Sequence, residues 1–487
     1  MQVRKWFSLF ILLLSAVMVV TDVLLSNTIL PAIGRYFGAS HAQMELVIAS
    51  YLIGYAVFLI AGGRAGDRFG RKGMYIVGLL GFSLFSVLSA FSASITQLVF
   101  FRFLEGASAA VMSPQAIALI QITFRDPEER GRAFGFFGVA LGVACVIGIT
   151  GAGVLLPIKS FLPGWRLSFL ITPFIGVLAV VLSFRFLEET TLEKRQSFDL
   201  AGLGILTIGL IALIYPIIEG RQAGWPLWAF FCLGGSVVIL GGFLRNQSAR
   251  RAGGKPVLID PGLFRKGHYS KGLLAVLFAF AAHNAFLLVY LLFIRHYAGT
   301  GFLHSVFPLN FYGIGFMVSS LVSIRYVPRF GRAVPQTGIA IMILALLGQV
   351  GMVFADLNPW FFCGSLFVYG LGQAMVLPPL LNVTLTDLPK CFAGTAVGVY
   401  YTFQQFASTL GVAIIGGIFF SILEKGGNLP YRNAFTYGTV AIIVSLIVTG
   451  ILLQRIPVPA GKQSGAGGPS DSPVPALNKR LRTLKVT

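Results

Sequence analysis

The sequence predicts an all-α integral membrane protein with fourteen membrane-spanning helices. Hydrophobic residues make up 56% of the 487-residue chain and charged residues only 11%, a composition that would leave a water-soluble protein short of polar surface. Apolar runs of about 20 residues, each long enough to cross a bilayer as a helix, recur along nearly the whole chain between short polar breaks. Positive charges gather in alternate breaks, as expected for an even number of spans.

The predicted spans fall into three groups along the chain. The first six are centred near residues 18, 53, 83, 109, 144 and 176, and a pair follows near residues 209 and 236. Six more are centred near residues 281, 316, 346, 371, 408 and 444. The first span follows Arg4 and Lys5, as a secretory signal would, but it carries Asp22 and ends in Pro31 without a small-residue cleavage site. We therefore interpret it as a retained helix.

The distribution of basic residues predicts the orientation. Fourteen spans place both termini on one side of the membrane. If that side is the cytoplasm, twenty-nine of the 37 Lys and Arg residues lie in cytoplasmic segments, seven lie on the other side, and Arg102 lies within a span. This is the pattern of the positive-inside rule. Topology and attraction to anionic headgroups therefore account for the net charge of +20, and we do not expect nucleic-acid binding.

An internal repeat relates spans 1–6 to spans 9–14. "RFGR" at 68–71 recurs at 329–332, "GASAAVMSP" (106–114) matches "GLGQAMVLPP" (370–379), and "GRAFG" (131–135) matches "GTAVG" (394–398), at offsets of 261 to 264. The repeat predicts two six-helix bundles, an inserted pair of spans with a long cytoplasmic loop, and a disordered basic tail. The expected boundaries are 1–190, 191–268, 269–455 and 456–487. Two such bundles around a central cavity are typical of secondary transporters.

A basic, glycine-rich segment lies between spans 2 and 3, with the sequence "GGRAGDRFGRKG" at 62–73. Small glycines allow helix ends to approach closely, and an acid among arginines can form ion pairs that hold one conformation closed. We interpret the segment as a gating loop, although the charges by themselves could simply mark the cytoplasmic face. Its predicted functional residues are Gly62, Gly66, Asp67, Arg68, Gly70, Arg71 and Lys72.

Three charged residues lie deep in predicted spans. A charge at the centre of a membrane helix costs about 2.5–3.5 kcal/mol on insertion scales, so each is a functional hypothesis. Arg102 and Glu105 are three residues apart and share a helix face, which also allows a purely structural ion pair. Asp22 has no partner within its own span and could exchange protons near neutral pH, although a hydrogen bond to another helix is the alternative. We predict that Asp22, Glu105 and Arg102 carry proton coupling.

Further polar groups lie within the spans and are candidates for a substrate cavity. His283 and Asn284 occupy the middle of span 9, where a histidine could relay protons, bind substrate or simply pack against another helix. Neighbouring residues on a helix point about 100° apart, so Gln404 and Gln405 cannot both face one cavity. The other candidates, on spans 1, 12 and 13, are Asn27, Gln373, Asn382, Tyr400 and Tyr401.

No pattern in the chain indicates an enzyme. The sequence has no GxxxxGK[ST] loop for ATP and no clear arrangement of nucleophile and base. The four cysteines and five histidines are scattered without the spacing of a metal site or a disulfide framework. We expect no metal and no cofactor, with transport driven by the proton gradient.

These motifs resemble the major facilitator superfamily and its 14-span drug:proton antiporter branch (the EmrB/QacA type). "GGRAGDRFGRK" is similar to that superfamily's loop between spans 2 and 3, "TDVLLSNTILP" (21–31) to the branch's span 1, and "FFRFLEGASAA" (100–110) to span 4. "GWRLSFLITPFIG" (164–176), "FDLAGLGILTIGLIALIYPIIEG" (198–220) and "GTAVGVYYTFQQFASTLGVAI" (394–414) are similar to span 6, the extra pair and span 13. The resemblance covers residues 5–455 and implies the major-facilitator fold, with Asp22 as the proton-coupling acid.

The chain departs from the branch at two positions. Glu105 occupies a position where the branch more often has an uncharged amide. Span 5 keeps the antiporter-like glycines Gly142, Gly148 and Gly153, but Ile149 replaces the proline that the family associates with antiport. The direction of exchange is therefore open.

Three functions are compatible with the sequence. The first is a proton-driven exporter of amphipathic or aromatic, often cationic, compounds, working by alternating access in a bacterial inner membrane. The second is a transporter for one metabolite, lipid or natural product, including symport. The third is a non-transporting membrane receptor, which the deep charges disfavour. A periplasmic adaptor and an outer-membrane channel are compatible partners, but no residue specifies them.

Overall fold

The computed structural model describes residues 2–158, 162–189, 199–222, 224–255, 257–265, 267–297, 307–330, 333–355, 360–385, 393–424 and 430–456. The predicted tail from residue 457 onward and the loop segment 190–198 lie outside these ranges. The regular elements are α1 (Gln2–Phe37), α2 (His41–Phe69), α3 (Arg71–Ala90), α4 (Ile95–Thr123), α5 (Pro127–Leu155), α6 (Gly164–Phe186), α7 (Leu200–Gln222), α8 (Leu227–Ala252), α9 (Gly262–Arg265), α10 (Gly267–Tyr297), α12 (Leu309–Phe330), α13 (Ala333–Phe354), α14 (Phe361–Ala374), α15 (Leu377–Thr384), α16 (Ala393–Glu424) and α17 (Pro430–Gln454).

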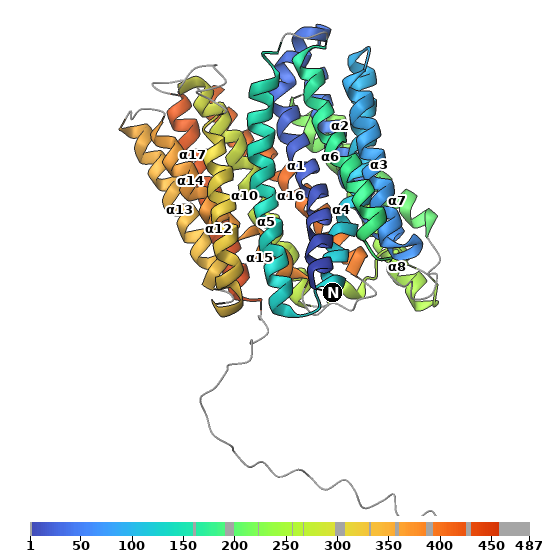
Figure 1. Ribbon diagram of the computed structural model, residues 1–487. Coiled ribbons are helices and arrows are strands. Elements are labelled where there is room, and N and C mark those ends of the chain that lie inside the picture. Colours follow the sequence, from blue (N-terminus) through green and yellow to red (C-terminus); the bar gives the residue numbers. More distant parts are fainter. Residues whose placement is uncertain are drawn as a thin grey trace, which may run out of the picture.

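The long helices run side by side in one bundle, which Figure 1 shows with the N-terminus at its lower end. Twelve spans in the described part of the chain are long and apolar enough to cross a membrane, with α14 and α15 together forming one of them. The chain is thus an all-helical integral membrane protein. The expected count of fourteen is not reached, because the apolar stretches described in α7 and α12 are shorter, at Ala201–Ile217 and Leu309–Ser323.

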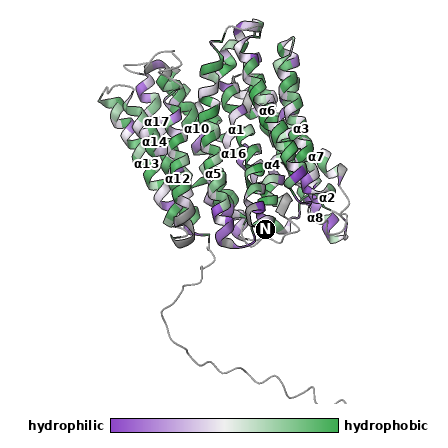
Figure 2. Cartoon of the chain, viewed as in Figure 1, coloured by the Kyte–Doolittle hydropathy of each residue, from purple (hydrophilic) through white to green (hydrophobic). Residues whose placement is uncertain are grey.

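Polar residues collect at the lower end of the bundle, while the flanks are mostly hydrophobic (Figure 2). We call this end, which carries the N-terminus, the α2–α3 turn and the C-terminal end of α8, the basic face. Helix α3 has 20 residues and at 1.5 Å per residue spans about 30 Å, the thickness of a bilayer's hydrocarbon core.

Side-chain caps and a glycine fix the helix boundaries near the basic face. Asp126 caps α5 by accepting hydrogen bonds from the N–H groups of Glu128 (3.0 Å) and Glu129 (2.9 Å), and Pro127 follows it at the first helical position. Helices α2 and α3 meet at Gly70, whose φ of 99° strongly favours glycine. The Asp126 cap and the Gly70 turn therefore place these two helix ends on one face of the bundle.

The same pattern of helix packing occurs twice. Helix α1 packs against α5 and α6, and α10 packs in the same way against α16 and α17. Helix α4 lies against α2 and α3, and α14 lies against α12 and α13. We call α1–α6 the N-terminal helices and α10–α17 the C-terminal helices.

The two sets also share the same glycine contacts, at the crossing of α2 with α4 and at that of α12 with α14. A Cβ on Gly54 of α2 would lie 2.2 Å from the carbonyl oxygen of Phe103 on α4. In the second set, a Cβ on Gly315 of α12 would lie 2.1 Å from the carbonyl oxygen of Phe367 on α14. Only glycine permits such a close approach of two backbones.

At the same crossing in each set, a second close contact has its glycine on the opposite helix. A Cβ on Gly106 would lie 2.1 Å from the carbonyl oxygen of Tyr51, and one on Gly370 would lie 2.2 Å from that of Tyr312. The α2 and α12 positions differ by 261 residues and the α4 and α14 positions by 264. These are offsets of the sequence repeat.

The two sets meet along α5 with α12 and along α2 with α16. Gly142 of α5 allows close packing at the first boundary, because a Cβ there would lie 2.8 Å from the carbonyl oxygen of Gly313 on α12. Helix α7 packs against α2, α16 and α8, so it covers the second boundary.

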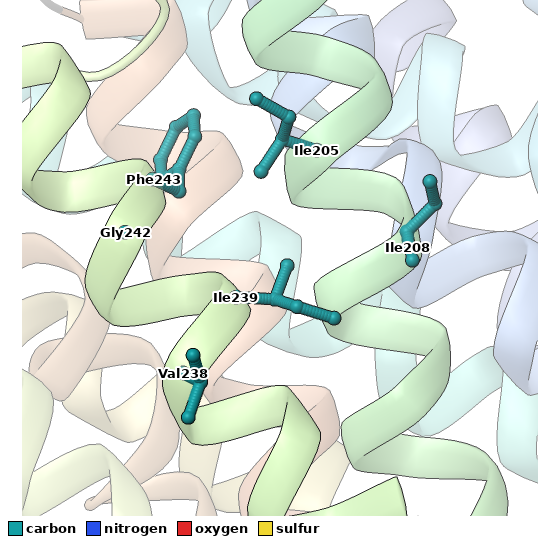
Figure 3. A pocket seen from close by; sticks show the side chains of 6 residues that line it. All are labelled: Ile205, Ile208, Val238, Ile239, Gly242 and Phe243. Atoms are coloured by element: carbon teal, nitrogen blue, oxygen red, sulfur yellow. The ribbon is translucent and has the colours of Figure 1, made fainter.

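An apolar groove of about 420 Å³ lies between α7 and α8, lined by Ile205, Ile208, Val238, Ile239, Gly242 and Phe243 (Figure 3). Ile208 and Val238 are 59% and 75% exposed, as expected for side chains that face lipid. The lining offers no polar side chain, so this groove does not carry the chemistry predicted from the sequence.

Candidate functional site

The three deep charges form one buried cluster, which we call the ion triad. The Arg102 guanidinium on α4 donates from Nη1 to Asp22 Oδ2 on α1 and to Glu105 Oε2 on α4, each at 2.8 Å. Asp22 and Arg102 are 1% exposed and Glu105 is fully buried. Two carboxylates therefore share one guanidinium in a site closed to water.

Asp22 has its partner on another helix, which is the alternative that the sequence left open. Its partner comes from α4, 80 residues further along the chain. The Arg102–Glu105 pair, in contrast, lies on a single helix at the predicted spacing.

The surroundings of the triad stabilise the cation but leave hydrogen-bonding capacity unused. The Arg102 guanidinium carbon lies 4.4 Å from the ring centre of Tyr51 on α2 and 5.5 Å from that of Phe169 on α6, within the range of cation–π attraction. Arg102 Nε and Glu105 Oε1 have no hydrogen-bond partner among the described residues. Buried polar atoms are normally hydrogen-bonded, so these two atoms distinguish the triad from a fully bonded structural ion pair.

Tyrosines lead from the triad toward the C-terminal helices. The rings of Tyr51 and Tyr55 on α2 stack with centres 6.2 Å apart. Tyr55 lies near Tyr401 of α16, and the Tyr401 ring meets that of Tyr400 edge-on at 5.6 Å. Tyr51 and Tyr55 were absent from the sequence-based set, because aromatic residues are common throughout the spans.

The structure brings some of the predicted cavity residues together in the C-terminal helices. The His283 ring on α10 stacks on Tyr312 of α12 at 6.2 Å, and Gln373 of α14 lies near His283. Asn284 instead turns toward α16, where its Nδ2 donates to Ser408 Oγ at 2.8 Å and to the carbonyl oxygen of Phe280 at 3.2 Å. His283 therefore faces α12 and α14, whereas its neighbour Asn284 faces α16.

Other members of the predicted set lie apart from this group. Asn27 is exposed, five residues beyond Asp22 on α1. Gln405 is buried and Gln404 is half-buried, as expected for neighbours that point in different directions. Asn382 lies on α15.

The predicted gating loop joins three helices at the basic face. Asp67 pairs with Arg71 at 2.8 Å, with both side chains 9% exposed. Lys72 Nζ donates to the carbonyl oxygens of Leu187 (2.7 Å) and Phe184 (3.3 Å) at the C-terminal end of α6, where a cation satisfies free helix carbonyls. The loop thus ties α2 and α3 to α6.

The glycines of this loop leave space for the side chain of Gln115 on α4. Gln115 Nε2 donates to the carbonyl oxygen of Gly62 at 2.6 Å. A Cβ on Gly66 would lie 1.8 Å from Gln115 Oε1, and one on Gly62 would lie 2.3 Å from the carbonyl oxygen of Ala110. Arg68 lies over the ring of Phe69 at 5.1 Å.

Arg64, which the predicted gating set did not include, connects this loop to the segment between α8 and α10. The Arg64 side chain is 8% exposed, and its Nε donates to the carbonyl oxygen of Leu258 at 2.6 Å while Nη2 donates to that of Val257. From the other side, Gln247 Oε1 of α8 accepts from the N–H of Leu258 at 2.6 Å. The Leu258 peptide unit is thus held by side chains from two helices.

The same network fixes the start of α7. Gln247 Nε2 donates to Asp199 Oδ2 at 2.8 Å, and Asp199 Oδ1 accepts from the N–H of Gly202 at 2.9 Å. Gln247 is fully buried and Asp199 is 4% exposed. A single glutamine near the end of an apolar helix was the available sequence signal, but its partners could not be identified from spacing.

Two of the antiporter-like glycines of α5, Gly142 and Gly148, lie at close contacts between helices. A Cβ on Gly148 would lie 2.9 Å from Leu24 Cβ on α1, and Thr21 Oγ1 donates to the carbonyl oxygen of Ala144 at 3.2 Å. Gly153 is half-buried. Ile149, at the position of the family's proline, is buried within a continuous helix.

Proteins named for antibiotic transport, export or resistance are similar to this chain over most of its length. It is 33% identical over 424 residues to the probable actinorhodin transporter of Streptomyces coelicolor, covering 86% of this chain and 73% of the relative. It is 28% identical to the tetracenomycin C resistance and export protein of Streptomyces glaucescens, with 85% and 76% covered. The puromycin resistance protein of Streptomyces alboniger is 28% identical, with 93% and 92% covered.

Solved transporters share the fold. The proton:xylose symporter XylE matches with a TM-score of 0.67 at 15% identity, covering 94% of this chain and 96% of that one. The human organic anion transporter MFSD10 matches with a TM-score of 0.66 at 14% identity, covering 92% and 99%.

The family model described as the Major Facilitator Superfamily matches residues 12–412. Together with the repeated helix packing, this match places the chain among transporters of small molecules rather than among enzymes. The chain belongs to the Major Facilitator Superfamily.

Proposed function

We propose that this protein is a proton-coupled exporter of amphipathic aromatic small molecules. The observation that carries the proposal is the ion triad, in which Asp22 and Glu105 share Arg102 at 2.8 Å each inside the helices. A structural pair needs one acid for one base. The second acid leaves an excess negative charge of one, and an unbalanced buried charge is strongly unfavourable.

One bound proton removes this excess charge. With the proton on either carboxyl group, the triad is neutral and stable away from water. Release of the proton requires that the triad be opened to water or that a cationic group approach it. A cycle in which the helices alternately expose the triad to the two sides of the membrane would therefore couple proton entry to the exit of another molecule.

The outward direction and the substrate class are supported by the relatives. Three of them are named for transport of, or resistance to, actinorhodin, tetracenomycin C and puromycin. The tyrosines between the triad and α16, namely Tyr51, Tyr55 and Tyr401, offer aromatic rings that suit substrates with flat apolar surfaces. We propose antiport even though Ile149 replaces the family's proline, because export against a gradient needs an energy source.

We further propose that α7 and α12 also cross the membrane, which gives the fourteen spans of the drug:proton antiporter branch. Their full lengths of 23 and 22 residues correspond to about 33–35 Å. The basic face is then cytoplasmic by the positive-inside rule, and the membrane is the bacterial inner membrane. Residues 1–190 and 269–455 would be the two moving halves, with 191–268 as the inserted pair and 456–487 as the tail.

A second candidate function is a transporter dedicated to one natural product. The similarity to proteins named for single compounds, actinorhodin and tetracenomycin C, favours it. It differs from the first candidate only in the breadth of substrates. Accessory partners such as a periplasmic adaptor would serve either function.

Proton movement driven by substrate tests the proposal. In inside-out vesicles with a respiration-driven pH gradient, reported by a quenched acridine dye, addition of an exported compound should release protons and restore fluorescence. The panel should include ethidium, tetraphenylphosphonium and 1,4-dihydroxyanthraquinone. We expect several compounds to dequench the dye in the wild type and none in Asp22→Asn.

The matched control is Glu128→Gln, which neutralises an exposed acid of a surface ion pair with Arg132. It should behave as the wild type. Full activity in Asp22→Asn would contradict coupling through Asp22, and a response to a single compound would favour the dedicated transporter. No response to any compound, with folded protein in the vesicles, would contradict both the broad exporter and its proton coupling.

A further inference from the structure

The C-terminal helices contain a counterpart of the ion triad. The 261-residue offset that superimposes α2 on α12 relates Tyr51 to Tyr312, and the 264-residue offset of α4 and α14 relates Glu105 to Tyr369. The 261-residue offset also relates Asp22 to His283. The contacts agree with the numbering, since His283 packs on Tyr312 and Tyr312 packs on Tyr369, with ring centres 6.2 Å and 6.3 Å apart.

The counterpart has lost the charges. The position of Arg102 is taken by Leu366, which is fully buried, and the positions of the two acids are taken by His283 and Tyr369. Helices α10, α12, α14 and α15 contain no Asp or Glu. A cation bound here would find no carboxylate partner on these helices.

The counterpart has kept polar atoms that need partners. His283 Nδ1, the Tyr369 hydroxyl and both the Oε1 and Nε2 atoms of Gln373 have no hydrogen-bond partner among the described residues. Tyr369 and Gln373 are fully buried. Buried polar groups are normally hydrogen-bonded, and a cluster of them without partners is a site where a ligand's own groups can bind.

Flat aromatic surfaces surround these atoms. Phe286 stacks on Tyr369 at 3.9 Å, and His283 stacks on Tyr312. Tyr312 precedes Gly313, where a Cβ would lie 3.0 Å from Cys145 Cβ on α5. The cluster therefore lies next to the boundary with the N-terminal helices, where a transported molecule must pass.

We propose that His283, Tyr312, Tyr369 and Gln373, which we call the His283 cluster, form the substrate-recognition site and select flat aromatic molecules without net charge that carry hydroxyl or carbonyl groups. Ring stacking and neutral hydrogen bonds hold the molecule here, while the ion triad carries the proton in the other set of helices. The inference rests on the proposed export function and narrows its substrate class.

Equilibrium binding to the purified full-length protein tests this site without any proton gradient. The probes are 1,4-dihydroxyanthraquinone, which is flat, neutral and bears hydroxyl and carbonyl groups, and ethidium, which is flat and cationic. The binding constant of each is measured at fixed pH in lipid nanodiscs. We expect saturable binding of the quinone, and Gln373→Leu and Tyr369→Phe should each weaken it by about tenfold, the usual effect of losing a hydrogen bond to a buried group.

Two matched controls make the same chemical changes elsewhere. Gln349→Leu alters a fully buried glutamine on α13, and Tyr290→Phe removes a buried hydroxyl on α10 outside the cluster. Within the part of the chain that the structure describes, these groups also lack hydrogen-bond partners. Both variants should bind the quinone as the wild type does. Gel filtration and thermal unfolding confirm that each variant is folded.

Each result bears on the site separately from proton coupling. Loss of quinone affinity in the cluster variants alone supports the proposal, even if the vesicle assay shows no proton movement. No saturable quinone binding to the wild type, equal affinity in all variants, or tighter binding of ethidium with the same dependence on Gln373 would overturn it.

Discussion

At the scale of single residues, Arg102 is the one positive charge of the ion triad and binds both of its acids. It supplies the hydrogen bonds between α4 and α1 that neutralise Asp22, and it binds Glu105 on its own helix. Removing it would leave two carboxylates together in a site that is almost closed to water. The ion pair between α1 and α4 and the proposed proton binding both depend on this one side chain.

Arg102→Leu should destabilise the protein by about 3–5 kcal/mol, because it leaves a buried charge without its partner. The measurement is thermal or denaturant-induced unfolding of the purified protein in detergent. Arg132→Leu is the control, since Arg132 and Glu128 form an ion pair at 2.6 Å with side chains 51% and 62% exposed, a type that contributes about 0–1 kcal/mol. Equal losses in the two variants would show that burial of the triad does not matter for stability.

The sequence identified the deep charges but only half of their geometry. Arg102 and Glu105 could be paired from their spacing on one helix. The Asp22–Arg102 bond could not, because it depends on how two helices pack across 80 residues of chain. His283 was singled out because a histidine in the middle of a span is unusual, but its neighbours Tyr312 and Tyr369 are ordinary aromatic residues in an aromatic-rich chain.

At the scale of helices, glycines determine how closely the backbones pack. Gly106→Ala and Gly370→Ala would each place a methyl group about 2 Å from a backbone carbonyl oxygen of the neighbouring helix, and backbone atoms cannot move aside as a side chain can. We expect both variants to lose about 1–3 kcal/mol or more and to express poorly. The equal effect at matching positions is the test of the repeated crossing.

Gly234→Ala is the control for these substitutions. Gly234 lies in α8 with nothing within 4 Å of an added Cβ, so alanine should be neutral or should stabilise the helix by about 0.5–1 kcal/mol. If Gly106→Ala were as well tolerated as Gly234→Ala, the close crossing of α2 and α4 would be wrong.

The segment 257–264 depends on Gln247 of α8 and Arg64 of α2. Gln247→Leu removes the acceptor for the N–H of Leu258 and the donor to Asp199. We expect amide hydrogen exchange in peptides covering 257–264 to increase by about tenfold, with no change in α4. Asn246→Leu, at the exposed neighbouring position of α8, should leave the exchange unchanged.

The helices and their close contacts could be predicted from sequence patterns better than the hydrogen bonds of the 257–264 segment could. The glycines near residues 62–70 pointed to close packing, which Gln115 and Ala110 of α4 supply. Two hydrogen bonds of Arg64 go to the main-chain carbonyls of Leu258 and Val257, and such acceptors are present at every residue. No residue type in 257–264 could therefore reveal the connection.

At the scale of the whole molecule, the proposed crossing of α7 and α12 has a direct test. Single cysteines replace Glu188, Leu227 and Thr337, in a chain whose four native cysteines have been removed. If both helices cross, positions 188 and 337 lie on the same side of the membrane and position 227 lies on the opposite side. We expect a membrane-impermeant maleimide to label position 227 in right-side-out vesicles, and the other two only after permeabilisation.

Each alternative topology gives a different labelling pattern. Position 227 labelled only after permeabilisation, as position 188 is, would show that α7 does not cross, and position 337 labelled in intact vesicles together with 227 would show the same for α12. Leu227 is 76% exposed and Thr337 is also exposed, so poor accessibility would not explain a failure to react.

The internal repeat was the part of the whole-molecule architecture most accessible from sequence. Three weak matches at offsets of 261 to 264 anticipated a correspondence that holds at the level of individual glycine contacts. The span count was less secure, because it depends on hydropathy over a fixed length and α12 interrupts its apolar stretch with Arg325 and Arg329.

The position of α7 makes the two flanks of the protein unequal toward the bilayer. This helix packs across the boundary between α2 and α16, and none of the other described helices occupies the same place between α5 and α12. A hydrophobic compound dissolved in the lipid therefore encounters a helix pair on one flank and the direct junction of the two halves on the other. In the proposed exporter, a compound that enters from the lipid would reach the junction of α5 and α12 without such a cover, so the thickness and packing of the lipid along these two helices would affect export more than the same properties along α7 and α8.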